Sequence, residues 1–385
     1  MKKKIAVITG SRADYDLLYK TLNLIKKSNK LKLQLYVTGA HLKKEYGLTV
    51  NQIYKDGFHV TAKINILNKI NDSLSVATSI SLGINLFSKS FYKNVPHLIL
   101  VLGDRYESFS AVIAAANLKI PIAHISGGEA SEANIDESIR HSITKFSHFH
   151  FAANRFYKKK IIQMGENPKS VFNVGGLGID NIKNNIYLNK TQISKELNFH
   201  FKNKNIILTY HPVTYLSKEK NCQELKIILS AIDKFPECGI IITYPNADLY
   251  NLNIIKILKN YIKNNKNAKL YKFLGRQKYL SCMKEVDLII GNSSSAITEA
   301  PFLKVPSIDV GTRQSGRLKA KSVIECKCSK KEIIKNIKKS FSSKFRDSIM
   351  RQQTFYGNGN SAEKILKVLE RKSNKDLLIK KFYYI

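Results

Sequence analysis

Acidic, basic and imidazole side chains gather in one part of this sequence. Asp104 and Arg105 stand together, Glu129 closes the run His124-Ile125-Ser126-Gly127-Gly128-Glu129, and Asp136-Glu137-x-x-Arg140-His141 follows. Each group alone would suit a structural role, since adjacent opposite charges pair and acids in a first helical turn favour the helix dipole. Crowded carboxylates drive their pKa values apart, so that one holds a proton while another removes one. The stretch therefore predicts acid/base chemistry; the candidate groups are Asp104, Glu129, Asp136 and Glu137.

Arginines mark two further turns. Arg12 follows the glycine turn Thr9-Gly10-Ser11, where we expect free backbone N–H groups to face an anion, and Arg313 lies in the loop Gly311–Arg317. A guanidinium fork matches the oxygens of a phosphate, which the point charge of lysine does not. The chain has no G-x-G-x-x-G run, which argues against a nicotinamide cofactor. These turns predict phosphate binding.

Small hydroxyl residues and a histidine form a third group in the second half of the chain. Ser293 and Ser294 lie in the turn between a predicted strand and a predicted helix, with Glu299 one turn into that helix. Amides at such a helix start would hold a diphosphate, and the carboxylate would accept ribose hydroxyls. His211 directly follows another predicted strand and serves either structure or catalysis.

Alternating short apolar runs and longer amphipathic segments must position these residues. The pattern is typical of parallel sheets with crossover helices. Expected strands in the first half are 4–9, 31–37, 97–102, 120–125, 149–152 and 171–174; in the second half they are 206–210, 239–244, 269–273, 286–290 and 307–310. We therefore expect an α/β protein of two Rossmann-like domains, residues 1–180 and 181–362, facing a central cleft. Residues 181–205 would be the linker, and a helical tail, 363–385, would pack back across the domains.

The composition argues against several classes of function. The formal net charge is +35, but 54 of the 64 basic residues are lysines spread along the whole chain, so we interpret them as a solvated surface and expect no nucleic-acid partner. No apolar run reaches the length of a membrane helix. Five scattered cysteines indicate reduced thiols and no metal site, which favours a cytoplasmic protein.

The motifs together resemble those of the hydrolysing UDP-N-acetylglucosamine 2-epimerases, in the NeuC/LegG-like branch of sialic and legionaminic acid biosynthesis. The matching stretches are TGSRADY at 9–15, VTGAHL at 37–42, LGDRYE at 102–107, HISGGE at 124–129, DESIRHSITK at 136–145, GNSSSAITEAP at 291–301 and DVGTRQSGR at 309–317. The resemblance implies a GT-B-like fold, a UDP-amino-sugar substrate, no cofactor and a homodimer. The implied reaction eliminates UDP to a 2-acetamidoglucal and adds water to give the free 2-epimer.

The resemblance also assigns roles to the residues. It implies that Asp104 and either Asp136 or Glu137 are the acid/base groups, with His211 near the phosphates. It implies that UDP is held by Arg12, Ala13, Arg105, Ser293, Ser294, Glu299 and Arg313. Several relatives carry a catalytic glutamate at the position of Ser126, and the loop between Glu129 and Asp136 is one residue longer here. Glu129 becomes the candidate for the vacated role.

The motifs leave the sugar open. Nothing in the motifs reads the substituents at C4 and C6, so two substrates are candidates. UDP-N-acetylglucosamine, giving N-acetylmannosamine, is slightly favoured over UDP-N,N'-diacetylbacillosamine, giving 2,4-diacetamido-2,4,6-trideoxymannose. A glycosyltransferase on the same fold and a basic nucleic-acid-binding protein are the alternatives from other classes.

Overall fold

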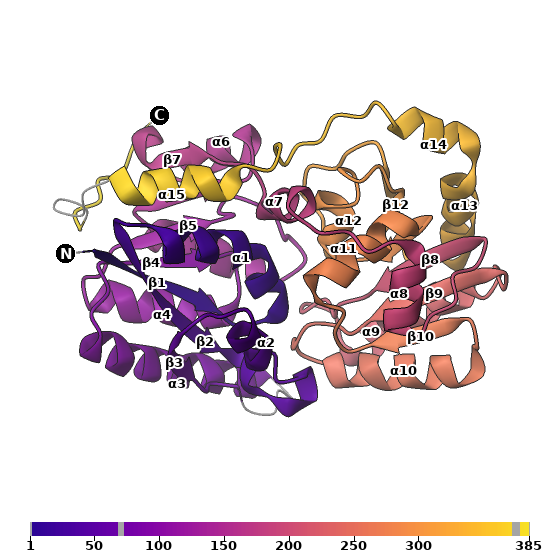
Figure 1. Ribbon diagram of the computed structural model, residues 1–385, viewed down its shortest axis with the longest axis horizontal. Helices are drawn as coiled ribbons and strands as arrows, with labels where there is room; N and C mark the ends of the chain where they lie inside the picture. Colours follow the sequence, from indigo (N-terminus) through magenta and orange to yellow (C-terminus); the bar gives the residue numbers. More distant parts are fainter. Residues whose placement is uncertain (1, 68–72, 372–377, 385) are drawn as a thin grey trace. The chain divides into compact units, whose positions relative to one another are not determined.

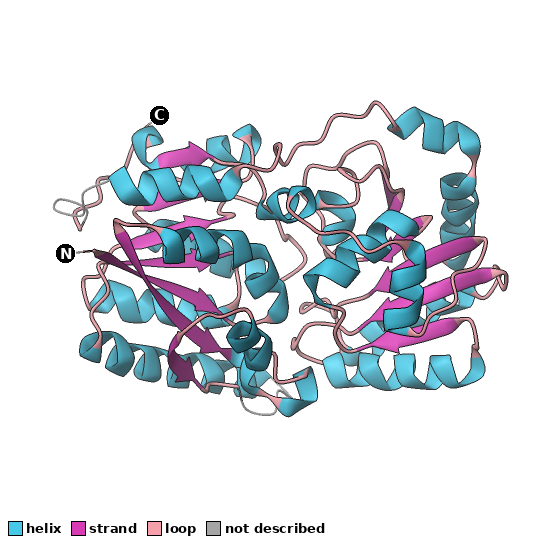
Figure 2. Ribbon diagram, in the orientation of Figure 1, coloured by secondary structure: helices cyan, strands magenta, loops and turns pink. Residues whose placement is uncertain are grey.

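A computed structural model describes residues 2–67, 73–371 and 378–384. The chain divides into unit 1, residues Met1–Glu129, Asp136–Asn181 and Tyr356–Ile385, and unit 2, residues Ala130–Ile135 and Ile182–Phe355. Each unit is a sheet flanked by helices (Figures 1 and 2). Every strand pair described in either sheet is parallel, which confirms the expected two-domain α/β fold.

Unit 1 contains a seven-stranded sheet in the order β3-β2-β1-β4-β5-β6-β7. The strands are β1 (Lys3–Thr9), β2 (Leu31–Thr38), β3 (Val60–Ile64), β4 (Leu98–Leu102), β5 (Ile122–Ile125), β6 (Phe149–Ala152) and β7 (Val171–Asn173). The central strands β4, β5 and β6 are buried along their whole length, as expected for strands covered on both faces. Since β1, β4 and β5 are neighbours, the turns that follow them meet at one edge of the sheet.

Helices cover both faces of this sheet. They are α1 (Arg12–Lys27), α2 (Val50–Lys55), α3 (Ser73–Lys93), α4 (Tyr106–Asn117), α5 (Asp136–Phe146), α6 (Arg155–Gln163), α7 (Leu177–Lys183) and α15 (Ser361–Arg371). The tail helix α15 packs against α1 and buries Ala362, Ile365 and Leu369 in the same core as β1 and β2. Both carboxylate oxygens of Asp180 accept backbone N–H bonds at its start, from Ser361 (2.9 Å) and Ala362 (2.7 Å). The tail helix therefore belongs to unit 1.

Unit 2 contains a six-stranded sheet in the order β10-β9-β8-β11-β12-β13. The strands are β8 (Lys204–Thr209), β9 (Cys238–Thr243), β10 (Ala268–Tyr271), β11 (Leu288–Gly291), β12 (Ser307–Val310) and β13 (Val323–Cys326). The helices are α8 (Lys190–Leu197), α9 (Lys218–Ile232), α10 (Asn251–Asn264), α11 (Gly275–Glu285), α12 (Ser295–Thr298), α13 (Lys330–Phe341) and α14 (Ser343–Ile349). Here β8, β11 and β12 are neighbours, so their following turns also share one edge.

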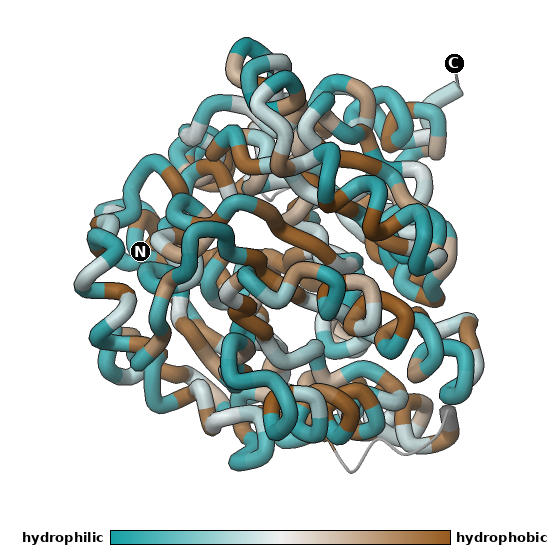
Figure 3. Tube along the Cα trace, turned by 90° about the vertical axis from the view of Figure 1, so that its right-hand side faces the viewer, coloured by the Kyte–Doolittle hydropathy of each residue, from teal (hydrophilic) through white to brown (hydrophobic). Residues whose placement is uncertain are grey.

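The structure differs from the expected elements at three points. Strands β3 and β13 were not expected, and the segment expected to be a plain linker, 181–205, contains helix α8. Residues 130–135 were expected in the first domain, but their contacts place them in unit 2. Colouring by hydropathy shows short hydrophobic and hydrophilic stretches alternating along the chain (Figure 3). Among the described residues, no helix combines the length and apolarity needed to cross a membrane.

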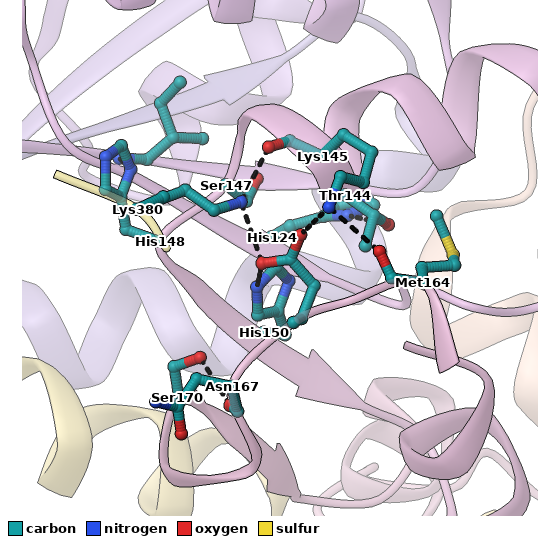
Figure 4. A network of polar contacts seen from close by, with 12 residues as sticks. His124, Thr144, Lys145, Ser147, His148, His150, Met164, Asn167, Ser170 and Lys380 are labelled. Carbon is teal, nitrogen blue, oxygen red and sulfur yellow. Dashed lines mark hydrogen bonds and ion pairs between the residues drawn. The ribbon is translucent and has the colours of Figure 1, made fainter. Parts of the chain in front are cut away.

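A buried polar network ties the end of the chain to β6 (Figure 4). The carboxylate of Glu166 accepts from Lys145 Nζ (2.8 Å), His150 Nε2 (2.9 Å) and Lys380 Nζ (2.8 Å). Burial would raise the pKa of Glu166, but the bonds from His150 and the two lysines outweigh it and lower the pKa to about 2. Burial lowers the pKa of His150, so its neutral ring donates one N–H to Glu166. The network holds the C-terminal segment on unit 1.

Candidate functional site

Asp104 lies just after β4 and is paired with an arginine from a neighbouring element. Gly103 turns the chain at φ +71°, and the Asp104 carboxylate then forms an ion pair with the guanidinium of Arg140 on α5. Arg140 also donates from Nη1 to the carbonyl oxygen of Ser126 (2.7 Å), and its side chain is 3% exposed. The sequence suggested Arg105 as the neighbour of Asp104, but Arg140 fixes this carboxylate. At 20% exposure, the Asp104 side chain keeps access to a ligand.

Helix α5 begins with two acids, Asp136 and Glu137. Asp136 lies four residues before Arg140, a spacing that places both on one face of the helix. Glu137 instead accepts a bond from His141 Nε2 (3.0 Å). Glu137 lies three residues before Arg140, so both acids neighbour the residue that binds Asp104, and Glu137 also bonds to His141.

The end of β5 carries the serine that stands where relatives have a glutamate. Ser126 has φ +64°, a left-handed conformation that is uncommon for a residue with a side chain. Its N–H donates to Phe151 O (2.9 Å), and its carbonyl oxygen accepts from Arg140. The turn that follows brings Glu129 to a position where it is 6% exposed. Ser126 therefore serves the site through its backbone, which orients Arg140.

The turn after β1 is arranged differently from what we expected. The N–H groups of Gly10 (3.3 Å) and Ser11 (3.0 Å) donate to Asp14 Oδ2, so neither is free to bind a ligand anion. Ser11 caps α1, whose first two residues are Arg12 and Ala13. Burial raises the pKa of Asp14 to about 6, with Arg105 lowering it and Glu107 raising it. The expectation of free amides at this turn was wrong, because the capping box uses them.

Arg105 is held by a carboxylate that the sequence did not single out. Glu107 is fully buried and accepts from Arg105 through Nε (3.1 Å) and Nη2 (3.1 Å). Its side chain lies against Gly10 and Gly39, where a Cβ atom would approach it to 3.0 and 2.6 Å respectively. The glycines leave room for this carboxylate, and a bidentate pair fixes the guanidinium in one plane.

Two buried histidines support this edge of unit 1. His41 bonds to the hydroxyls of Thr9 (2.9 Å) and Thr49 (2.7 Å), and His124 bonds to Gly103 O (2.7 Å) and Thr144 Oγ1 (3.2 Å). Burial lowers the pKa of each ring to about 3, so both are neutral at physiological pH. They hold the turns after β1 and β4 in place.

In unit 2, Asn292 connects the three turns that follow β8, β11 and β12. Its Oδ1 accepts from the His211 N–H (2.7 Å), and its Nδ2 donates to the His211 carbonyl (2.8 Å). Its own carbonyl oxygen accepts from Arg313 Nη1 (3.2 Å) and Gln314 Nε2 (2.8 Å). Asn292 is fully buried, and the sequence analysis did not single it out. Asn292 thus fixes the backbone of His211 and the side chain of Arg313, two residues that were predicted to lie at the nucleotide site.

The donors around Asn292 suit a diphosphate. His211 accepts the Asn246 N–H at Nδ1 (3.0 Å), which sets its ring orientation. The buried Nε of Arg313 makes no hydrogen bond within the described part of the chain. Ser293 Oγ bonds to Ser295 Oγ (3.1 Å), and Ser294 is the N-cap residue of α12. Helix α12 is shorter than expected, four residues, so Glu299 lies at its C-cap and bonds to Thr298 Oγ1.

The structure therefore gathers the predicted residues into two sets. Unit 1 brings together Asp104 with the helical face of Asp136, and Arg105 with the turn after β1. Unit 2 brings together His211, Ser293 and Arg313 around Asn292. The first set can move protons, and the second can donate hydrogen bonds to phosphate oxygens.

Comparison with known proteins points to one family. Residues 23–370 match the family described as UDP-N-acetylglucosamine 2-epimerase. The chain is 39% identical to a Campylobacter jejuni GDP/UDP-N,N'-diacetylbacillosamine 2-epimerase (hydrolyzing), over 99% of this chain and 98% of the relative. It is 36% identical to an Escherichia coli polysialic acid biosynthesis protein P7, over 100% and 98% of the two chains. A Legionella pneumophila UDP-N,N'-diacetylbacillosamine 2-epimerase (hydrolyzing) is 32% identical over 96% of each chain.

A solved structure of similar fold is the UDP-GlcNAc 2-epimerase of Neisseria meningitidis bound to UDP-GlcNAc. It superposes with a TM-score of 0.81 over 96% of this chain and 100% of that one, at 20% identity. At this identity the likeness concerns the fold, and it agrees with the GT-B-like architecture that we expected.

Proposed function

Since this chain belongs to the UDP-N-acetylglucosamine 2-epimerase family, we propose that it hydrolyses a UDP-linked 2-acetamido sugar with inversion at C2. The observation that carries the proposal is the arrangement at the end of β4. There Arg140 pairs with Asp104 and shares one helical face with Asp136. The carboxylate fixed by Arg140, together with the acids at the start of α5, would supply the proton transfers that inversion at C2 requires.

The proposed reaction has two stages. A carboxylate takes the proton from C2, the C2–H electron pair forms the C1=C2 double bond, and the C1–O bond breaks with its electrons going to the β-phosphate oxygen of UDP. Water then adds across the double bond, placing hydroxyl on C1 and a proton on C2 from the opposite face. The products are UDP and the free 2-epimeric sugar. Bases and acids on both faces of the ring are needed, which one carboxylate alone does not provide.

We assign the proton transfers to Asp104 and Asp136. The ion pair with Arg140 holds Asp104 in one orientation, and the i,i+4 spacing places Asp136 on the same face of α5 as Arg140. Glu137 is a weaker assignment because it bonds to His141. Glu129, which follows the turn after Ser126, would act in place of the missing glutamate.

We assign the nucleotide to the donors of unit 2 together with the arginines near β1. Charge builds up on the diphosphate as the C1–O bond breaks, and fixed donors stabilise it without reorganising. Arg313 and Ser293 would contact the phosphates, with His211 beside them. Arg12, Ala13, Arg105, Ser294 and Glu299 would complete the UDP contacts.

The relatives change the preference for the sugar. Two of them, at 39% and 32% identity along nearly their full lengths, are named as diacetylbacillosamine 2-epimerases. We therefore propose UDP-N,N'-diacetylbacillosamine as the substrate and 2,4-diacetamido-2,4,6-trideoxymannose as the product, in place of the slight preference for UDP-N-acetylglucosamine. The latter is the second candidate, favoured by the likeness to a polysialic acid biosynthesis protein.

Incubation with each UDP-sugar in heavy water, followed by proton NMR, tests the proposal. We expect release of UDP together with a free 2-epimerised sugar that carries deuterium at C2, faster with UDP-N,N'-diacetylbacillosamine. The Asp104→Asn variant is the control and should bind UDP without turning over either sugar. Faster turnover of UDP-N-acetylglucosamine would overturn the sugar assignment. Unchanged sugars in both reactions would refute the function itself.

A further inference from the structure

Residues 130–135, the bridging segment, join two proposed acids of unit 1 while packing in unit 2. The chain leaves unit 1 after Glu129, contributes these six residues to unit 2 and re-enters unit 1 at Asp136. A six-residue connection has little slack, so the place of the bridging segment restrains the backbone at both of its ends. What holds the bridging segment therefore bears on Glu129 and Asp136.

The C-terminal end of the bridging segment is held by Thr214. Asn134 is 1% exposed, and its Oδ1 accepts from both the N–H (3.0 Å) and the hydroxyl (3.3 Å) of Thr214. The same hydroxyl oxygen accepts the N–H of Ile135 (3.1 Å), the residue directly before Asp136. Thr214 lies three residues after His211, so this anchor is part of the turn that we assign to the phosphates.

The other end is held by the loop that carries Arg313. Arg317 Nε donates to the Ala130 carbonyl (2.9 Å), and Asn134 Nδ2 donates to the Arg313 carbonyl over a longer distance, 3.4 Å. Gly316, at φ +78°, lies so close that a Cβ atom there would meet Glu132 Oε1 at 2.2 Å and Ala130 Cβ at 2.7 Å. The bridging segment is thus in contact along its length with the two turns that flank Asn292.

We propose that Asn134 is a positioning residue that couples nucleotide binding in unit 2 to the placement of Glu129 and Asp136. When a diphosphate orders the His211–Thr214 turn and the Arg313 loop, the bonds of Asn134 and Thr214 order the bridging segment and the start of α5 with them. The inference rests on the proposed function for the identity of the acids. Catalysis is sensitive to such placement, since a displacement of about 1 Å can cost roughly a hundredfold in rate.

Substitutions at Asn134 and Thr214 test the coupling in the full chain. We expect Asn134→Ala to lower kcat roughly tenfold to a hundredfold, while the Kd for UDP measured by calorimetry stays within about twofold of wild type. Thr214→Val should lower kcat in the same direction, because valine keeps the shape but loses the hydroxyl. Thr214→Ser restores the hydroxyl and should retain the wild-type kcat.

Asn205→Ala is the matched control for the loss of a buried asparagine from unit 2. Asn205 is 1% exposed and bonds to both the N–H (2.9 Å) and the carbonyl (2.8 Å) of Lys202 at the opposite end of β8. This variant should lower the melting temperature without changing kcat. An unchanged kcat in Asn134→Ala would contradict the coupling. So would a fall in kcat that merely equals the fall in UDP-binding stoichiometry, because it would reflect only the loss of correctly folded protein.

Hydrogen exchange separates this inference from the proposed function, because the experiment uses UDP as its ligand and requires no turnover of a sugar. In wild type, UDP should slow exchange in residues 211–214 and 311–317 and also in residues 136–141. In Asn134→Ala the protection of 211–214 and 311–317 should persist, and that of 136–141 should be lost. Equal protection of 136–141 in both proteins, or none in wild type, would overturn the coupling whichever sugar is turned over.

Discussion

Asp136 and Glu137 are adjacent in the sequence and lie in the first turn of α5. Glu137 bonds to His141, and Asp136 lies four residues before Arg140, which pairs with Asp104. The sequence left the choice between the two acids open, because both suit the first turn of a helix. Only the identity of the neighbours distinguishes them.

A pair of isosteric substitutions tests this distinction. Asp136→Asn should lower kcat by about 10²–10⁴-fold, the usual contribution of a general acid or base. Glu137→Gln should stay near the wild-type kcat, because glutamine still accepts a bond from His141. Steady-state UDP release measures both. The reverse order of effects would transfer the acid/base role to Glu137.

Asp14 gives a pH dependence of stability. Burial raises its pKa from 3.8 to about 6, so the folded state binds this proton more tightly than the unfolded state. Its contribution is fully present below about pH 4 and is lost as the pH rises through about 6. A shift of this size corresponds to about 3 kcal/mol in the free energy of unfolding.

Denaturant unfolding of wild type and Asp14→Asn between about pH 4 and 7 measures this effect. The free energy of unfolding of Asp14→Asn, relative to wild type, should rise with pH across that window. Because both proteins share every other titrating group, the difference isolates Asp14. A difference that stays constant with pH would show that this carboxyl titrates normally.

The sequence predicted the strand ends that carry the candidate residues better than it predicted the partners of those residues. Asp104, Ser126 and His211 could be assigned to strand ends because a strand end follows from a short apolar run. The pairing of Asp104 with Arg140 joins residues 36 apart, and it depends on how α5 packs against α4 and β5. Glu107 and Asn292 are buried polar residues whose roles follow from neighbours that no local pattern specifies.

At the scale of elements, the turns after β8, β11 and β12 form one assembly around Asn292. Its side chain makes both bonds to the His211 backbone, and its carbonyl oxygen receives Arg313 and Gln314. Gly291 precedes it at φ +134°, and a Cβ atom there would lie 1.9 Å from Thr209 O. The close approach of β11 to β8 therefore requires glycine and brings Asn292 within reach of His211.

Removing this side chain should weaken nucleotide binding. We expect Asn292→Ala to raise the Kd for UDP about tenfold, equivalent to about 1.4 kcal/mol, because His211 loses its backbone anchors. Calorimetry measures the Kd, and thermal unfolding shows whether the variant is folded. The Asn205→Ala variant again controls for loss of a buried asparagine. An unchanged UDP affinity in a folded Asn292→Ala protein would contradict the assembly.

There are physical reasons why the sequence did not predict strands β3 and β13 or the short length of α12. Strand β3 ends the sheet of unit 1, and most of its residues are only half-buried, so it lacks the apolar run of a central strand. Strand β13 likewise ends the sheet of unit 2 and carries Glu325. Helix α12 ends at Thr298, shortly before Pro301, since the residue before a proline is pushed away from helical conformation.

At the scale of the whole molecule, the C-terminal segment contributes to a buried charge network. Lys380 and Lys145 both bond to Glu166, which is 2% exposed. Lys380→Met should lower the free energy of unfolding by about 1.5–3 kcal/mol, the usual worth of a bond to a charged group. The neighbouring exposed residue Lys381 provides the matched control, Lys381→Met, which should leave stability unchanged. Equal stabilities for the two variants would remove Lys380 from the network.

The division into units was the least predictable feature. A boundary near residue 181 follows from the change to a polar stretch, but nothing in the composition of residues 130–135 indicates that they pack in unit 2. Their place is set by Asn134, Thr214 and Gly316, whose contacts span about 80 residues or more of sequence. Such pairings follow from the fold and not from periodicity.

The return of the chain to unit 1 has a consequence for biosynthesis. Helix α15 fills the core beside β1 and β2 and is capped by Asp180, so unit 1 lacks part of its interior until residues 361–371 have left the ribosome. Unit 2 needs nothing beyond Phe355. Domains usually fold during synthesis in order from the N-terminus. Here unit 1 is the first to be translated, but its chain is completed only after that of unit 2. Until then the core residues that α15 covers would remain exposed, and a truncated message ending before α15 would yield a protein with only unit 2 complete.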